Sequence, residues 1–333
     1  MTDTETEPLL RTEGLTRHFK IGNAMSRVTL HAVDDVSVTI GSREIVALAG
    51  ESGSGKSTIA RLLAKIYRPT SGEIYFQGRP VSSIRSRKDL LQYRGDVPMV
   101  FQDPFSSINP VYRASYGLLR TMKLHRPELN AAQRQQEAVR ALEAVGLSPA
   151  TDVMQRYPHE LSGGQRQRIG FAQALAYRPK LILADEPVSM LDVSIRVGLL
   201  NLMSDLRSRE GVSFLYITHD LASARYVSDR LMVMYAGHIV ESGPTEDVLA
   251  DPQHPYTQLL LSAAPDPRTP LTIEGDTDIG EPPRVIDPGP GCRFRWRCPL
   301  AIDRCEVDDP ALLELRPAHS AACHVAAASV EVR

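Results

Sequence analysis

The stretch from Gly50 to Thr58 is the part of the chain whose residue types and spacing most directly imply chemistry. It reads Gly-Glu-Ser-Gly-Ser-Gly-Lys-Ser-Thr and matches the phosphate-binding pattern G-x-x-x-x-G-K-[ST]. Glycines let backbone N–H groups turn toward phosphates, and the start of a following helix adds partial positive charge. Lys56 can reach the terminal phosphates and Ser57 can bind Mg²⁺. The stretch predicts a nucleoside triphosphate site formed by Gly50, Glu51, Ser52, Gly53, Ser54, Gly55, Lys56, Ser57 and Thr58.

Two adjacent carboxylates follow a second apolar run, Leu181–Ala184. Ligands of open α/β sheets bind at the carboxyl ends of the strands, which is where Asp185 and Glu186 are expected. Beside a phosphate loop, Asp185 is suited to hold Mg²⁺, and Glu186 to polarise a water that attacks the γ-phosphate. The alternative is a solvated acidic turn, which the pairing with the phosphate loop disfavours.

Other polar or aromatic residues stand at positions where they could reach such a site. Gln102 follows the apolar run 97–101, and His219 follows the run 214–218. Ser162 is suited to cap a helix that begins with Gly163-Gly164-Gln165, which makes an anion-receptive helix start. Phe19 could stack on a base, although it could equally be an ordinary strand aromatic.

These residues require an α/β framework to bring them together. We expect strands at 10–20, 36–40, 45–49, 71–78, 97–101, 181–184 and 214–218. We expect helices at 59–66, at 131–145 with Gly146 as the C-cap, and from Ser162 to about Tyr177. The helical character of 111–158 indicates a helical insertion between two parts of one sheet.

Composition narrows the class of protein. The chain has 333 residues, 42% of them hydrophobic, and a formal net charge of -2, so no basic field suggests nucleic acid as a partner. It contains no apolar run near the ~20 residues that span a bilayer, and Met1–Pro8 is too polar for a signal peptide. We therefore expect the chain to stay in the cytosol.

Taken in order, these motifs resemble the complete set of an ATP-binding cassette (ABC) ATPase over roughly residues 10–262. The resemblance implies catalytic roles for Glu186, His219 and Gln102, and Gln102 would also bind Mg²⁺. Phe19 would stack on adenine. The segments Leu161–Gln165 and Ser189–Asp192 would be the signature and the D-loop, in which Met190 replaces a common Ala. Further nucleotide-site residues on this resemblance are Asp185, Ser162, Gly163, Gly164, Gln165 and Asp192.

The resemblance implies a P-loop NTPase, a RecA-like α/β core of ABC type. An antiparallel β subdomain and a helical subdomain at about 103–165 would complete residues 10–262. Two cassettes would pair head to tail, with each ATP between one Walker A loop and the opposite signature. The Ser162 hydroxyl and nearby N–H groups would complete the γ-phosphate shell of the opposite subunit. The partner is therefore a second cassette, identical or homologous.

The segment Asp251–Thr257, with its His-Pro-Tyr sequence, is similar to ATPase subunits of oligopeptide/dipeptide importers. This implies a C-terminal extension at 263–333, two membrane-spanning permeases, an extracytoplasmic binding protein and a place on the cytoplasmic face of the membrane. Members import peptides, nickel or oligosaccharides. The competing interpretation is a soluble ABC protein acting on ribosomes or DNA, which the single cassette and the charge disfavour.

All four cysteines lie in the extension, after a proline-rich linker at 265–291. Cys292, Cys298, Cys305 and Cys323 have the spacing C-x5-C-x6-C-x17-C. In a reducing cytosol a metal or cluster is favoured over disulfides. Without close C-x-x-C pairs, zinc is open but not favoured, and the spacing is not a common ferredoxin pattern. The resemblance to the importer subfamily points to a [4Fe-4S] cluster at 292–323 that would staple a segment with little core.

Overall fold

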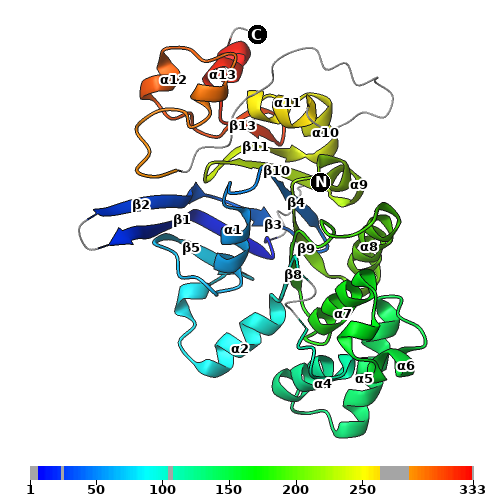
Figure 1. The fold of residues 1–333 in the computed structure, drawn as a ribbon. Coiled ribbons are helices and arrows are strands. Elements are labelled where there is room, and N and C mark those ends of the chain that lie inside the picture. Colours follow the sequence, from blue (N-terminus) through cyan, green and yellow to red (C-terminus); the bar gives the residue numbers. More distant parts are fainter. Residues whose placement is uncertain (1–6, 24–25, 104–107, 263–284, 332–333) are drawn as a thin grey trace, which may run out of the picture.

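The computed structural model describes residues 7–23, 26–103, 108–262 and 285–331, which form two sheets with helices around them (Figure 1). The larger sheet has the strand order β12-β13-β11-β10-β4-β9-β8-β7. Five neighbouring strands in it are parallel: β10 (Arg230–Tyr235), β4 (Ile45–Ala49), β9 (Ser213–Thr218), β8 (Leu181–Asp185) and β7 (Met99–Val100). Their carboxyl ends therefore meet at one edge of the sheet.

The central parallel strands are buried on both faces, as their continuous apolar sequences predict. In β4, Ile45 and Ala47 face one hydrophobic core, whereas Val46 and Leu48 face the other. All five residues of this strand are fully buried. A shift of register by one residue would exchange the two faces, so the sizes of these side chains help to fix the register.

The smaller sheet is antiparallel and confirms the predicted β subdomain. It comprises β1 (Leu10–Asn23), β2 (Ser26–Val36), β3 (Thr39–Ile40), β5 (Ser71–Phe76) and β6 (Arg79–Pro80). The strand predicted at 36–40 is divided, because β2 ends at Val36 and β3 is a separate short strand on β1. In the larger sheet, the strand predicted at 97–101 is only Met99–Val100, at the edge of the sheet. It begins after Pro98, which has no N–H to donate.

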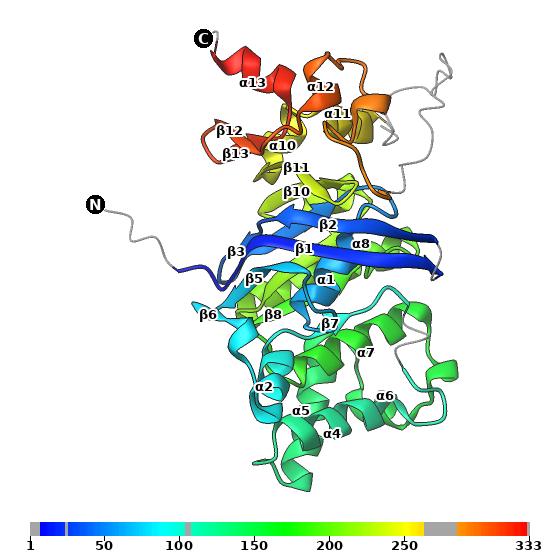
Figure 2. The same cartoon turned by 90° about the vertical axis from the view of Figure 1, so that its left-hand side faces the viewer.

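The helical insertion is also present, as α4 (Ala114–His125), α5 (Ala131–Ala144) and α6 (Ala150–Gln155). Asn130 and Gln133 form a capping box at the start of α5. Gly146 follows its end with a φ of 72°, which a glycine adopts without strain. Figure 2 shows these helices together with α7 (Gly163–Leu175), below the two sheets.

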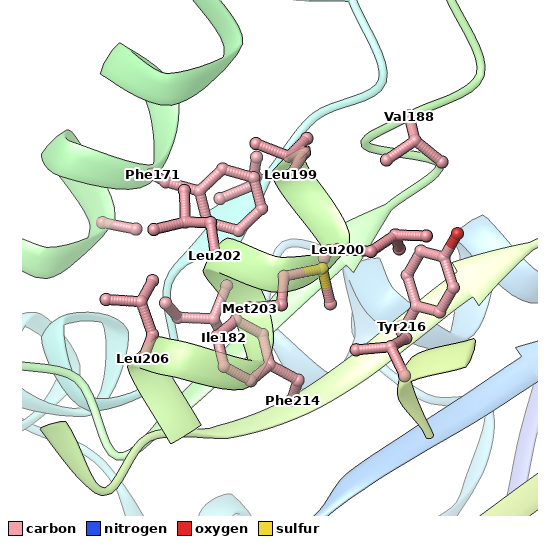
Figure 3. Close-up of a cluster of buried hydrophobic side chains, with 14 of the residues drawn as sticks. Phe171, Ile182, Val188, Leu199, Leu200, Leu202, Met203, Leu206, Phe214 and Tyr216 are labelled. Carbon is pink, nitrogen blue, oxygen red and sulfur yellow. The ribbon is translucent and has the colours of Figure 1, made fainter. Parts of the chain in front are cut away.

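The core between this helical part and the sheet is built around α8 (Val193–Asp205). Figure 3 shows its apolar side chains beside residues of α7, β8 and β9. The cluster contains Phe171, Ile182, Leu199, Leu200, Leu202, Met203, Phe214 and Tyr216. Burying one such side chain fully contributes roughly 1.5–3 kcal/mol, so this cluster fixes α7 against the sheet.

Further helices of the cassette are α1 (Lys56–Leu63), α2 (Arg87–Asp96), α9 (Leu221–Val227) and α10 (Thr245–Ala250). The sequence predicted α1 at 59–66, three residues too late. The helix begins at Lys56 because Gly55, with a φ of 111°, is its N-cap. In the part of the chain that the structure describes, no helix is both long and apolar enough to cross a membrane.

The C-terminal segment, residues 285–331, packs on the cassette (Figures 1 and 2). It contains α12 (Arg304–Val307), β12 (Leu313–Arg316), β13 (His319–Ala321) and α13 (His324–Glu331). Strand β13 pairs with β11 (His238–Pro244), so the segment extends the main sheet. Most of the predicted linker, 265–291, lies outside the described residues, but the carbonyl oxygen of Val285 within it accepts a hydrogen bond from the His31 N–H of β2.

A buried carboxylate joins this segment to α11 (Pro255–Ser262). Glu241 is completely buried and accepts hydrogen bonds from the N–H groups of Gln253 and His254, at 2.7 and 3.0 Å. Its third partner is His319 of β13, at 2.7 Å. One side chain thus holds both the start of α11 and the added strand.

His254 must be neutral to make its own contact. Its Nδ1 accepts a hydrogen bond from the Tyr256 N–H at 3.0 Å, and burial lowers the pKa of His254 to about 3. An unfolded histidine has a pKa near ~6.5. The stabilisation that neutral His254 contributes to folding is therefore complete above pH ~6.5. It is lost as the pH falls toward the pKa of His254 in the folded chain.

We expect His254→Asn to reduce the acid sensitivity of folding, because an amide oxygen accepts the same hydrogen bond without titrating. Between pH 7 and 5, the free energy of unfolding of the native chain should fall about 1–2 kcal/mol more than that of the variant. Urea titrations at several pH values measure this difference. His159→Asn, at an exposed histidine, is the control, and identical pH slopes for all three proteins would contradict the assignment.

Candidate active site

The phosphate loop follows β4 in a conformation that requires glycine at two positions. Gly50 and Gly55 have φ angles of 151° and 111°. A Cβ on Gly50 would lie 2.2 Å from the Met234 carbonyl oxygen, and one on Gly55 would lie 2.2 Å from the Ala32 carbonyl oxygen. Both neighbours are backbone atoms, so they cannot move aside cheaply. The loop is thus held between β10 and β2 by direct backbone approach.

Lys56 lies inside this loop at the start of α1. Its Nζ donates hydrogen bonds to the carbonyl oxygens of Gly50 and Glu51, both at 2.7 Å, and the residue is 4% exposed. Burial lowers the pKa of Lys56, and the charges of Glu186, Asp185 and Glu51 oppose that shift. These contacts keep a buried ammonium group within the loop, where it can act on the phosphates of a bound nucleotide.

Ser57 and Asp185 lie together, as predicted. The Ser57 hydroxyl donates to an Asp185 carboxylate oxygen at 2.9 Å, and Asp185 is 5% exposed. Burial raises the pKa of Asp185, with the Ser57 hydrogen bond acting in the opposite direction. A buried carboxylate beside a hydroxyl is a set of hard oxygen ligands of the kind that Mg²⁺ prefers. The residues present therefore fit a magnesium ion.

Of the three predicted catalytic residues, Gln102 and His219 both contact the third, Glu186. Gln102 Nε2 donates to a Glu186 carboxylate oxygen at 3.1 Å, and His219 Nδ1 lies 3.2 Å from the same oxygen. The Glu186 N–H donates to the Ile217 carbonyl oxygen at 3.0 Å, and its φ is 45°, which is uncommon for a residue other than glycine. The backbone turn after β8 thus aims this carboxylate toward the ends of β7 and β9.

Gln102 has a second partner in the predicted D-loop. Its amide also donates to Ser189 Oγ at 3.3 Å, and that hydroxyl donates to the Glu186 carbonyl oxygen at 3.0 Å. The amide N–H groups of Gln102 therefore contact the Glu186 carboxylate and the predicted D-loop. Magnesium binding by Gln102 stays a prediction. Asp192 is exposed and precedes α8 as its N-cap.

Phe19 is half-buried on β1, and two residues that the sequence did not single out surround it. The Arg17 guanidinium carbon lies 4.5 Å from the centre of the Phe19 ring, and the Tyr67 ring packs edge-on with centroids 5.5 Å apart. These contacts fix the orientation of Phe19. Stacking on adenine stays a prediction.

The signature residues begin α7, as predicted. The Ser162 hydroxyl accepts a hydrogen bond from the Gln165 N–H at 3.2 Å, and the Gln165 side chain accepts one from the Ser162 N–H at 3.0 Å. Gly164 has no room for a side chain, since a Cβ there would lie 2.6 Å from Ile195 Cγ2. Helix α7 packs with α4, α5 and β7, whereas α1 packs with β2, β8 and β9. The signature and the phosphate loop therefore begin two different helices, which pack on different elements.

The four cysteines are free thiols gathered in the C-terminal segment. The Cys292 N–H donates to the Cys305 carbonyl oxygen at 2.9 Å. Burial raises the pKa of the Cys292 thiol to about 11, and the nearby Cys305 and Cys298 raise it further. Burial likewise raises the pKa of the Cys298 thiol, and Cys323 adds to that shift. Among the described residues, no three cysteine sulfurs all lie within 4.8 Å of one another.

Sequence reasoning missed the contacts that the C-terminal part makes with the phosphate loop. The Glu51 N–H donates to the Tyr256 hydroxyl at 2.8 Å, and Arg297 pairs with the Glu51 carboxylate. The His-Pro-Tyr segment was noticed for its family resemblance alone. Periodicity and local spacing give no information on partners separated by more than 200 positions.

Comparisons with known proteins agree with this geometry. A family model described as ABC transporter matches residues 33–189, and one described as the C-terminal region of oligopeptide/dipeptide transporters matches residues 240–305. The chain is 45% identical over 321 residues to a Brucella ovis protein named for peptide import, covering 96% of this chain and 98% of that protein. It is 38% identical over 330 residues to an oligopeptide transport ATP-binding protein of Bacillus subtilis, covering 98% and 99%.

Solved structures give the same assignment and confirm the predicted fold class. The dimeric ATP-binding cassette MJ0796, in a post-hydrolysis state bound to ADP and Pi, superposes with a TM-score of 0.62 at 27% identity. The match covers 71% of this chain and 98% of that one. CbiO1 of Clostridium perfringens, part of an ABC transporter complex, gives a TM-score of 0.63 at 25% identity, covering 74% and 92%. The chain belongs to the ABC transporter ATPases, in the oligopeptide/dipeptide transporter family.

Proposed function

We propose that this ATPase drives the uptake of peptides by hydrolysing MgATP at the interface of two head-to-tail cassettes. The observation that carries the site assignment is the Glu186 carboxylate, held by Gln102 and His219 beside the Ser57–Asp185 pair. Glu186 polarises the attacking water, and His219 positions it at the γ-phosphate. Mg²⁺, held by Ser57 and Asp185, supplies charge neutralisation when it is bound.

A head-to-tail dimer is supported by the similarity to the dimeric cassette MJ0796. In such a pair the phosphate loop, which begins α1, and the signature, which begins α7, would each complete a site with its counterpart on the second cassette. Ser162 and the N–H groups of Gly163 and Gly164 then contact the γ-phosphate of the opposite subunit. Closure depends on ATP, and hydrolysis weakens it.

The transport role is supported by the whole-chain similarity to proteins named for peptide or oligopeptide import. The partners are two membrane-spanning permeases and, indirectly, an extracytoplasmic binding protein. With these partners, the ATPase would act on the cytoplasmic face of the membrane. Nickel or oligosaccharides are the alternative cargo, because the permeases and the binding protein select the solute.

We expect Glu186→Gln to bind MgATP and to trap a closed pair of cassettes with little turnover. The amide keeps the shape of the side chain and its contact distance but is not a base. Turnover should fall at least about 100-fold, which is the usual scale of general-base catalysis. Gel filtration with MgATP and phosphate release measure the two effects. Native turnover in this variant would remove Glu186 from the mechanism.

The decisive experiment on transport is co-purification with the neighbouring permeases. In lipid, peptide-loaded binding protein should stimulate ATP hydrolysis, and Glu186→Gln should remove that stimulation. Binding protein loaded with nickel or an oligosaccharide is the comparison for cargo. Failure to associate with any permease, together with stimulation by ribosomes or DNA, would favour a soluble ABC protein instead.

We also propose that the cysteines hold a [4Fe-4S] cluster, with zinc as the alternative. The proposal is supported by four free thiols in one small segment, no three of which lie within 4.8 Å of one another. A cubane accepts four thiolates at wider separations. Bound there, the cluster would act as a staple for the segment, which adds its strand to β11 but has few buried apolar residues of its own.

Anaerobically purified protein should contain about four irons per chain, the content of one cubane. Cys298→Ser should lose most of this iron together with its visible absorbance, because a hydroxyl is a poor replacement for a thiolate. Ala301→Ser, at an exposed site between Cys298 and Cys305, is the matched control and should keep its iron. One zinc per chain with no iron would establish the alternative.

A further inference from the structure

The C-terminal segment makes a two-pronged ion pair with the phosphate loop. Arg297 donates to both carboxylate oxygens of Glu51, at 2.7 and 2.9 Å. The side chains are 10% and 26% exposed, so solvent screens the pair only partly. The hydrogen bonds with Glu51 raise the pKa of Arg297 further above its usual range. This is a bidentate arrangement, the strongest form of such a contact in proteins.

The same loop residue is held through its backbone by the His-Pro-Tyr segment. The Tyr256 hydroxyl accepts from the Glu51 N–H at 2.8 Å, and Tyr256 is fully buried. Its ring packs against Tyr235 and Phe294, with centroids 4.5 and 5.5 Å away. Phe294, three residues before Arg297, is itself 2% exposed. Arg297 therefore extends from an anchored aromatic cluster, not from a free tail.

An unpaired Glu51 would oppose nucleotide binding. The carboxylate belongs to the loop that is to receive a polyanion, and like charges repel strongly where water is partly excluded. The Glu51 carbonyl oxygen also accepts from Lys56 Nζ, so movement of this residue disturbs the lysine. Arg297 neutralises the carboxylate and fixes its position at the same time.

We infer that Arg297 is a positioning residue for nucleotide binding, through which the C-terminal segment holds the phosphate loop ready for MgATP. The inference rests on the assignment of Gly50–Thr58 as the phosphate loop. Preorganisation of this kind improves affinity, because the loop does not have to be ordered when the ligand binds. It acts equally on the ground state and the transition state, so it affects KM more than kcat.

The competing explanation is that the ion pair only anchors the C-terminal segment. Other contacts already anchor it, since β13 pairs with β11, His319 bonds Glu241, and Arg293 forms an ion pair with Asp34 of β2. Loss of an anchor alone would lower thermal stability and leave nucleotide affinity unchanged, whereas loss of a positioning contact weakens nucleotide binding. The two explanations are therefore separable in one set of variants.

The test is calorimetric titration of the full chain with MgADP, combined with ATPase kinetics. Arg297→Ala should raise Kd and KM by about tenfold and change kcat by less than about twofold, since tenfold corresponds to ~1.4 kcal/mol. Arg304→Ala is the matched control, because Arg304 pairs with Asp308 in the same segment, at 2.9 Å, on the surface. Its Kd should equal that of the native chain.

The dependence on Glu51 is tested by a second substitution. Adding Glu51→Gln to Arg297→Ala should recover most of the lost affinity, because the unpaired carboxylate is removed. If Arg297→Ala is unstable, Arg297→Lys replaces it. Arg297→Lys keeps the positive charge but cannot donate the two parallel hydrogen bonds to Glu51, so its Kd for MgADP should rise by about threefold.

Three outcomes would count against the inference or its basis. Equal Kd values for Arg297→Ala and Arg304→Ala would overturn it, and so would a loss that Glu51→Gln leaves unrepaired. Lys56→Ala separates these from failure of the site assignment. If Lys56→Ala binds MgADP normally, the phosphate loop itself is wrongly assigned. If Lys56→Ala binds weakly but Arg297→Ala binds normally, the site assignment stands and only the role of Arg297 is removed.

Discussion

The parallel pairing of β7, β8, β9 and β4 is the constraint on which the rest of the site depends. These strands carry no catalytic group in their interiors, where every residue of β4, β8 and β9 is buried. Their common direction brings the residues that follow them to one edge, so Gln102, Glu186 and His219 meet although they are far apart in the chain. The two hydrophobic cores fix the register of the strands and, through it, the distances between these three side chains.

Much of this arrangement could be predicted from sequence, because local pattern contains it. A short apolar run followed by a glycine loop predicts β4 and the phosphate loop, and an apolar run ending in Asp185-Glu186 predicts β8. The predicted bounds of elements were wrong where they depend on backbone conformation or long-range pairing, which the local sequence pattern does not contain. The start of α1 depends on the left-handed conformation of Gly55, and the length of β7 depends on Pro98. The separation of β2 from β3 likewise depends on long-range pairing, because the two strands pair with different parts of β1.

The C-terminal segment was the least predictable part for a physical reason. Its sequence indicated a proline-rich linker and a cysteine cluster, and both descriptions suggest a separate appendage. Instead, β13 joins the main sheet, and the buried Glu241 binds His319 from this segment and the start of α11 from the cassette. A buried carboxylate is costly unless its hydrogen bonds are satisfied, so folding of the cassette edge and docking of the segment depend on each other.

The phosphate loop is consequently held from two sides. From within, Lys56 bonds the carbonyl oxygens of Gly50 and Glu51. From outside, Tyr256 accepts the Glu51 N–H and Arg297 pairs with the Glu51 carboxylate. The inner contacts follow from the loop motif alone, whereas the outer ones require the C-terminal residues to be in place. An ABC cassette that lacked these residues would have to order Glu51 by other means, so in this chain the extension and the nucleotide site form one structural unit.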